Sequence, residues 1–159
     1  MASYNIPSLG ISVYEHTDTS EFLKDKSEEI SLVQFPYNVL DKRFESIFDE
    51  KLNFSGVKQA RSLFLQGILV NRKLAFDNFP KHKEILYEWF DWCDKNKISP
   101  AVQCLNQCYS SNYADEIVLG ISSKQHVHTL NLISNFKYTF KSSYSIPLDL
   151  LDPRKWRND

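Results

Sequence analysis

The sequence predicts an α/β fold in which four parallel strands are each followed by helices that pack outside the sheet. Four short apolar runs are separated by longer segments whose apolar residues recur at helical spacing. None of the runs alternates cleanly between apolar and polar residues, which favours strands of a parallel sheet buried on both faces. The four predicted strands are residues 8–13, 32–35, 59–64 and 116–121.

The first two helices follow the first two strands. Asp18 is followed three residues later by Glu21, which predicts an N-cap with a capping box and a helix over residues 19–27. After the second strand, an apolar stripe at helical spacing ends shortly before Gly56. The stripe consists of Phe44, Ile47, Phe48 and Leu52.

Three more helices are predicted from proline and serine positions. Pro80 and Pro100 each stand where a helix begins, because proline is tolerated in the first helical turn. The stripe after Pro80 reaches Lys97, and Ser123 caps a last helix. The apolar residues of the first two of these helices are Ile85, Leu86, Trp89, Phe90 and Cys93, then Ala101, Cys104, Leu105 and Cys108.

Composition limits the function classes. The 159 residues suit one domain, and a net charge of −1 gives no indication of a nucleic-acid partner. No apolar run approaches the roughly 20 residues that span a bilayer, and the N-terminus lacks the regions of a signal peptide, so we expect a cytoplasmic protein. An odd count of three cysteines predicts buried thiols and no metal site.

The segment 137–159 is predicted to be a tail that lies over the surface of the same domain. It is polar and aromatic, and it ends in the apolar residues Leu150, Leu151 and Trp156, which we expect to anchor it.

Polar residues gather at the C-terminal ends of all four predicted strands. In α/β folds this edge of the sheet is where ligands bind, although serine and amide side chains also cap loops in the absence of any ligand. Both interpretations remain open for each residue. The residues are Ser12 and Tyr14; Gln34, Tyr37 and Asn38; Arg61, Ser62 and Gln66; and Ser122 and Ser123.

Five motifs in order give the chain a resemblance to a known family. They are LGISVY (9–14), VQFPYNVLDKRF (33–44), ARSLFLQGILV (60–70), EIVLGISSKQHVHTL (116–130) and LLDPRKW (150–156). From about residue 6 to residue 156 the sequence resembles the C-terminal half of aldo-keto reductases, nearest the bacterial branch associated with polysaccharide biosynthesis. The resemblance implies a half of a (β/α)8 TIM barrel, in which this chain supplies family strands five to eight.

The resemblance also implies roles in binding NADP(H). Gln34 and Ser12 match the residues that hold the nicotinamide carboxamide, and Arg61 stands where many relatives stack an aromatic ring on the nicotinamide. Ser62, Leu63 and Gln66 match the loop that passes the pyrophosphate, while Ser122 and Ser123 match the site of the adenosine phosphate. Val13 and Leu130 lack the polar groups expected there, so weak binding is expected. Ser122 stands where an arginine often holds the 2′-phosphate in the family, so NAD is a possible cofactor.

The catalytic Asp, Tyr, Lys and His of the family lie on the four strands that this chain lacks. The resemblance therefore implies no catalytic residues here, and a small carbonyl substrate only if a complementary N-terminal half barrel is present. The alternative is a non-catalytic half-barrel binding or assembly module, or a truncated gene product, that self-associates. Because a half barrel leaves two strand edges open, we expect a homodimer or a complementary half as partner.

Overall fold

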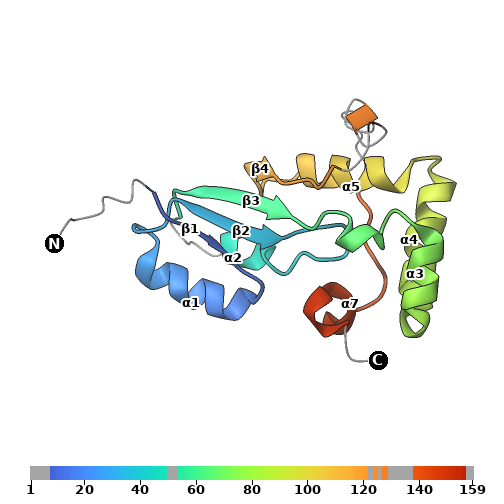
Figure 1. Cartoon of the computed structure of the whole chain (residues 1–159), viewed down its shortest axis with the longest axis horizontal. Coiled ribbons are helices and arrows are strands. Elements are labelled where there is room, and N and C mark those ends of the chain that lie inside the picture. The colour runs from blue at the N-terminus through green and yellow to red at the C-terminus, as the bar shows by residue number, and fades with distance from the viewer. Residues whose placement is uncertain (1–7, 50–53, 122–123, 125–126, 129–137, 157–159) are drawn as a thin grey trace.

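A four-stranded, entirely parallel sheet forms the centre of the molecule (Figure 1). The computed structural model describes residues 8–49, 54–121, 124, 127–128 and 138–156. The strands are β1 (Gly10–Ser12), β2 (Leu32–Pro36), β3 (Val57–Arg61) and β4 (Glu116–Ile117), and they lie side by side in chain order. The predicted α/β class, strand number and parallel direction are confirmed.

β2 begins at the predicted residue and ends one residue later than predicted, whereas the other three strands are shorter than the predicted runs or shifted from them. The third strand was predicted over 59–64, but β3 ends at Arg61 because Ser62 adopts a left-handed backbone with φ of 62°. Such a backbone cannot continue a strand. The fourth was predicted over 116–121, but β4 has only two residues, and β1 has three where six were predicted.

Helices cover one face of this sheet. Leu23 of α1 (His16–Lys26), Ile47 of α2 (Glu45–Asp49) and Leu105 of α5 (Pro100–Tyr109) pack in one cluster with Val33 and with other residues of the same face. On the opposite face β2 carries Leu32 and Gln34, which are only half-buried. The prediction that the strands are buried on both faces is therefore wrong for the described chain. The sequence did not reveal the half-exposed face, because apolar and polar residues do not alternate cleanly in the strands.

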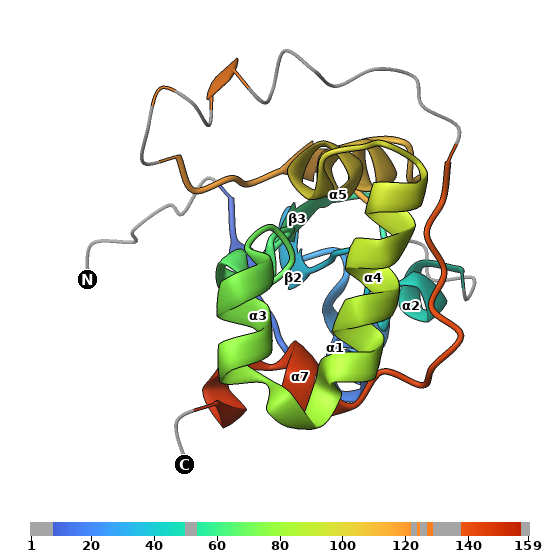
Figure 2. The same cartoon turned by 90° about the vertical axis from the view of Figure 1, so that its right-hand side faces the viewer.

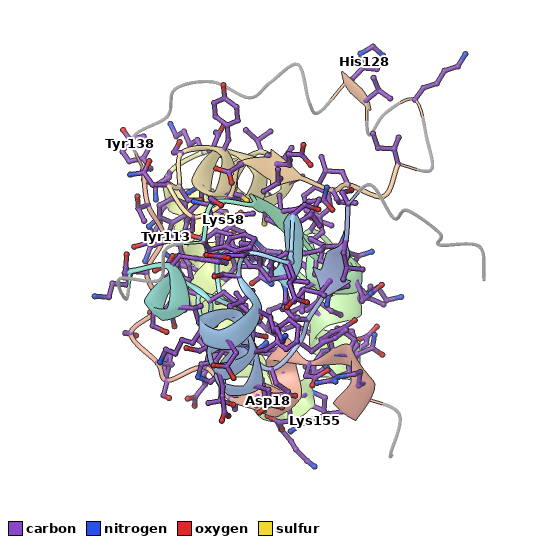
Figure 3. The ribbon with its side chains drawn as sticks, turned by 90° about the vertical axis from the view of Figure 1, so that its left-hand side faces the viewer. Asp18, Lys58, Tyr113, His128, Tyr138 and Lys155 are labelled. Carbon is purple, nitrogen blue, oxygen red and sulfur yellow. The ribbon has the colours of Figure 1, made fainter. Side chains whose placement is uncertain are left out.

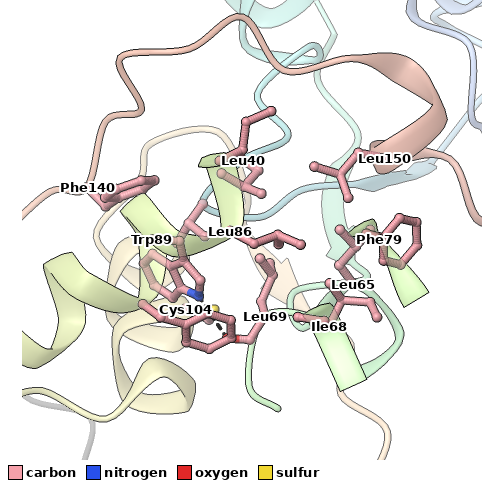
Figure 4. Packing of buried hydrophobic residues seen from close by; sticks show 14 of the residues in the cluster. Leu40, Leu65, Ile68, Leu69, Phe79, Leu86, Trp89, Cys104, Phe140 and Leu150 are labelled. Atoms are coloured by element: carbon pink, nitrogen blue, oxygen red, sulfur yellow. Dashed lines mark hydrogen bonds between the residues drawn. The ribbon is translucent and has the colours of Figure 1, made fainter. Parts of the chain in front are cut away.

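A second core lies beyond the C-terminal ends of β2 and β3. There α3 (Arg72–Asn78), α4 (Lys83–Lys95) and α7 (Leu148–Leu151) stand together across the strand ends (Figures 1 and 2). Trp89 is fully buried at its centre and donates from Nε1 to the carbonyl oxygen of Leu69 at 2.8 Å (Figure 4). This bond fixes the loop after β3 against α4, so the second core sets the shape of the strand ends.

The first helix starts earlier than the sequence predicts. It begins at His16 with Glu15 as its N-cap residue, so Asp18 lies inside the first turn and caps nothing. Glu15 forms an ion pair with Arg154, in which Glu15 Oε1 lies 2.5 Å from Arg154 Nη2. Because this contact joins residues far apart in the chain, local capping patterns could not reveal it.

The remaining helices agree with the proline signals, with one addition. Pro80 opens a short 3₁₀ turn (Pro80–His82) that leads into α4, and Pro100 is the first residue of α5. Helix α3 was not predicted, although Asn71 caps it by accepting from the backbone N–H of Leu74. The helix predicted after Ser123 falls almost entirely outside the described residues. No helix in the described part is long and apolar enough to cross a bilayer.

The tail is held by buried polar side chains as well as by its predicted anchors. Leu150 and Leu151 are buried in the second core, as predicted. Gln107 of α5 accepts from the N–H of Phe140 and donates to its carbonyl oxygen, at 3.0 and 3.1 Å. Gln103 donates to the carbonyl oxygen of Tyr138 at 2.8 Å. The two amides thus hold residues 138–140 against α5, much as a neighbouring strand would.

Glu88 of α4 holds the next part of the tail. Its carboxylate accepts from both hydroxyls of Ser142 and Ser143 at 2.5 Å and from the N–H of Ser143 at 2.9 Å. Burial acts to raise the pKa of Glu88, but these three bonds outweigh it and lower the pKa below its ordinary value of 4.5. The charged form is therefore the one that the folded tail stabilises.

We predict that Glu88→Gln lowers the free energy of unfolding by about 1–2 kcal/mol at pH 7, because an amide cannot accept all three bonds. A lowered pKa in the folded state adds stability above pH 4.5, and this contribution is lost as the pH falls through the folded-state pKa. The difference between the two proteins in urea unfolding should thus shrink below pH 4.5. Glu84→Gln, at an exposed position of the same helix, is the control, and a difference that stays constant down to pH 3 would contradict the assignment.

Candidate functional site

A row of hydrogen-bonded side chains crosses the uncovered face of the sheet. The strand register places Ser12, Gln34, Gln59 and Glu116 next to one another on β1, β2, β3 and β4. Ser12 donates to Gln34 Oε1 at 3.0 Å, and Gln34 Nε2 donates to Gln59 Oε1 at 2.7 Å. Gln59 Nε2 in turn donates to Glu116 Oε2 at 2.7 Å. We call these four residues the polar row.

The chemistry of its last member gives the polar row a direction. A carboxylate only accepts hydrogen bonds, so Glu116 requires the amide nitrogen of Gln59 to face it. Gln59 then presents its oxygen to Gln34, and Gln34 presents its own oxygen to Ser12. Each amide keeps one N–H and one lone pair unused by the row, which leaves Gln34 able to bind a further polar group.

Arg61, the last residue of β3, reaches across the C-terminal edge of the sheet. Its Nη2 donates to the carbonyl oxygen of Val13, just past β1, at 2.8 Å, and its Nη1 donates to the Ser62 hydroxyl at 3.2 Å. Its guanidinium lies 3.9 Å from the centre of the Tyr14 ring. Within the described part of the chain no carboxylate forms an ion pair with Arg61, so its charge is not neutralised there.

A second arginine contacts the same ring but has its charge compensated. The Arg154 guanidinium lies 4.3 Å from the centre of the Tyr14 ring. Arg154 also pairs with Asp152, which is 1% exposed, and with Glu15. Hydrogen bonds from Arg154 outweigh the effect of burial and lower the pKa of Asp152. Of the two arginines at Tyr14, only Arg61 therefore carries a charge that no carboxylate of the described residues compensates.

Arg61 also borders a cleft at the ends of β3 and β4. The cleft has a volume of about 740 Å3, within the range of small-molecule sites. One wall is the loop after β3, in which Ser62, Leu65 and Gln66 all have positive φ. The remaining lining is mostly apolar and comes from both sides of the cleft: Leu63, Phe64, Gly67, Val70, Ala101, Leu105, Val118, Leu119, Gly120 and Ile121.

The Tyr-Asn pair after β2 supports this loop from within. Asn38 is 2% exposed, and its Oδ1 accepts from the N–H groups of Leu40 and Asp41 at 2.9 Å. Its Nδ2 donates to the carbonyl oxygen of Ser62 at 3.3 Å, which holds the left-handed turn. The buried Tyr37 hydroxyl donates to Glu45 at 2.6 Å, and burial together with this bond raises the pKa of Tyr37. Both residues are thus structural.

The structure brings most of the predicted site residues to one edge of the sheet. Ser12 and Gln34 lie on its open face, Arg61 and Ser62 lie between that face and the cleft, and Leu63 and Gln66 line the cleft. The predicted Ser122 and Ser123 lie outside the described residues. Sequence reasoning missed Gln59 and Glu116, because only the strand register shows that they continue the row from Gln34.

The three cysteines are buried, as predicted. Burial raises the pKa of Cys93 and of Cys108 to about 12, so neither is a thiolate at neutral pH. Among the described residues no group of His, Cys, Asp or Glu side chains is arranged to hold a metal ion.

Comparison of the chain with models of known protein families gives no match, and comparison with curated protein sequences gives none either.

The direction of the polar row can be tested by moving its carboxylate. We predict that Gln59→Glu lowers the free energy of unfolding by about 1–2 kcal/mol at pH 7, because two carboxylates then face each other with no donor between them. Adding Glu116→Gln should restore stability to within about 0.5 kcal/mol. The carboxylate introduced at position 59 then accepts from Gln34 on one side and from the new amide on the other.

The controls are Glu116→Gln alone, which should have little effect, and acidification of the Gln59→Glu protein. Below about pH 4.5 one carboxyl of the pair is protonated and can donate, so the destabilisation should decrease. Urea unfolding measures all four proteins. If the double variant were no more stable than Gln59→Glu, the two side chains would not be coupled and the row would be misassigned.

Proposed function

We propose that the chain is the cofactor-binding half of an NAD(P)H-dependent aldo-keto reductase, with its sheet as half of a TIM barrel. The observation that supports this most is the position of Arg61. An arginine without an acidic partner among the described residues stands at the C-terminal edge of a parallel sheet, beside a cleft of about 740 Å3. A guanidinium in such a place suits an anionic ligand, and its planar fork can bind two phosphate oxygens at once.

The groups around Arg61 suit the other parts of a dinucleotide. Among the described residues, one N–H and one lone pair of Gln34 have no partner, and a carboxamide supplies the matching acceptor and donor. The apolar lining of the cleft suits a flat aromatic base. Arg61 lies between Gln34 and the cleft, so one extended ligand could contact all three. NADP(H) is favoured by the sequence resemblance, and NAD(H) would satisfy the same groups.

The proposal does not extend to catalysis by this chain alone. Reduction of a carbonyl leaves an alkoxide, which needs an acid within hydrogen-bond reach. The Tyr37 hydroxyl is buried against Glu45, and the Tyr14 ring lies between two guanidinium groups. We propose that reduction of a small carbonyl substrate requires a complementary half barrel carrying the Asp, Tyr, Lys and His. A non-catalytic assembly module is the second candidate, and the open edges of the sheet favour it.

We predict that the chain binds NADPH or NADH weakly and that Arg61→Ala lowers the affinity at least tenfold. The loss follows from removing a charged hydrogen-bond donor, worth about 1.5–3 kcal/mol. Isothermal titration calorimetry measures it, with circular dichroism to confirm folding. The affinity of Arg61→Lys should lie between those of the wild type and Arg61→Ala, because lysine keeps the charge and lacks the planar fork of the guanidinium.

The matched control is Arg72→Ala. Arg72 also lies over a ring, that of Phe90, and donates to a backbone carbonyl, but it is on α3 and does not line the cleft. Equal losses from the two substitutions would show that the effect is not specific to the cleft. An unchanged affinity in Arg61→Ala would refute the site.

A separate prediction concerns turnover. The purified chain should not oxidise NADPH in the presence of simple aldehydes, whereas addition of a chain that supplies the first four strands should restore activity. In that complex Gln34→Ala should weaken cofactor binding by roughly 1–3 kcal/mol. Absorbance of NADPH follows the reaction. Turnover by the chain alone that is lost on changing Tyr14 or Tyr37 to Phe would show that the catalytic group had been misassigned.

A further inference from the structure

The two ends of the polar row differ in what they offer to a ligand. At one end Glu116 accepts from Gln59 at 2.7 Å, and a carboxylate has no hydrogen to donate. At the other end Ser12 gives its only O–H to Gln34 Oε1 at 3.0 Å. The oxygen of Ser12 therefore offers lone pairs and no hydrogen to any further group.

Ser12 and Gln34 together present an acceptor beside a donor. One N–H of Gln34 is bonded to Gln59 at 2.7 Å, and the second N–H has no partner among the described residues. A carboxamide fits this pair with its NH2 group on Ser12 and its oxygen on the N–H of Gln34. An acetyl group of similar size has no N–H, so it places a methyl group against the oxygen of Ser12 and leaves that acceptor unsatisfied.

The charged neighbour of Gln59 lies on the other side of the sheet. Lys58, which precedes Gln59 in β3, points to the helix-covered side, where Tyr113 also lies (Figure 3). Its ammonium group is 5.8 Å from the centre of the Phe48 ring, which packs against the same helices. Side chains alternate along a strand, so Gln59 is left on the open face. Among the described residues, Glu116 is therefore the only charged partner of its amide.

The far side of the sheet decides the hydrogen-bonding pattern at Ser12. The row crosses all four strands, so Glu116 lies three strand spacings, or about 14 Å, from Ser12. Every bond in the row points the same way, toward the carboxylate. If one amide turned over, the next would have to follow, because two amide oxygens or two N–H groups cannot bond to each other. Glu116 thus fixes the hydroxyl of Ser12 through the two glutamines.

We propose that Glu116 and Gln59 are positioning residues that make the cofactor site selective for a carboxamide. This inference rests on the cofactor site proposed above. In a row of the opposite direction Gln34 donates to Ser12, and the Ser12 hydroxyl is free to donate to the ligand. An acetyl oxygen then satisfies it as well as an amide oxygen does. The native direction also disfavours the nicotinic acid form of the dinucleotide, because its carboxylate has no N–H.

The experiment compares the affinities of the chain for NADP+ and for its 3-acetylpyridine analogue by isothermal titration calorimetry. The two nucleotides carry the same charge and differ only where a methyl group replaces the NH2 group. The wild-type chain should bind NADP+ roughly three- to tenfold more tightly, the difference made by one neutral hydrogen bond. Glu116→Lys places a donor beside Gln59 and reverses the row, so the ratio of the two dissociation constants should fall to about one.

Two further variants separate the direction of the row from the charge at position 116. Adding Gln59→Glu to Glu116→Lys supplies a carboxylate that accepts from the introduced lysine and from Gln34, so the native direction and the wild-type ratio should return. Gln59→Lys keeps Glu116 and donates to both neighbours, so it should lower the ratio as Glu116→Lys does. It replaces Glu116→Lys if circular dichroism shows the latter unfolded.

The ratio distinguishes positioning from a merely structural role, which would weaken both nucleotides equally. An unchanged ratio in a folded Glu116→Lys or Gln59→Lys chain would overturn the inference, as would a folded double variant that does not restore the ratio. Equal binding of the two nucleotides by the wild type would overturn it as well. A chain that binds neither nucleotide would overturn the proposed cofactor site too, whereas binding of NADP+ with a ratio that no substitution changes would leave that site intact.

Discussion

In the described part of the chain the helices cover only one face of the parallel sheet, and the other features of the site follow from this constraint. Val33 and Phe35 fill the covered face of β2, so Gln34 between them must point to the open face. A half-buried amide there needs partners. It finds them in the side chains of the neighbouring strands, which produces the polar row from Ser12 to Glu116. The polar side chains on the open face of the sheet thus hydrogen-bond to one another, without a layer of helices over them.

At the C-terminal ends of the strands, two arginines, Arg61 and Arg154, contact the ring of Tyr14. Arg154 is neutralised by Asp152 and Glu15 and fixes the tail against the start of α1. Arg61 binds only neutral oxygens of Val13 and Ser62 in the described part of the chain. The Tyr14 ring therefore contacts two cations of different kinds. Arg154 is compensated and holds the tail, whereas Arg61 has no acidic partner in the described part of the chain and borders the cleft.

The tail contributes more to the fold than its position at the end of the chain implies. Buried amides of α5 and the carboxylate of Glu88 bind its backbone and hydroxyls, while Leu150 and Leu151 enter the second core. That core positions α3 and α4 behind the loop after β3. The loop's left-handed residues are thus supported from two sides, by Asn38 and by the bond from Trp89 to Leu69.

The sequence by itself determined the α/β class, the four parallel strands, the helices opened by Pro80 and Pro100, and the placement of polar residues at strand ends. These features depend on local spacing and on proline geometry, which are readable along the chain. Tertiary structure alone decided which strand face stays open in the described part of the chain, that Gln59 and Glu116 complete the row, and that Glu15 instead of Asp18 is the N-cap residue of α1. Each of these depends on strand register or on a contact such as Arg154 with Glu15, and a side chain more than a hundred residues away leaves no local pattern.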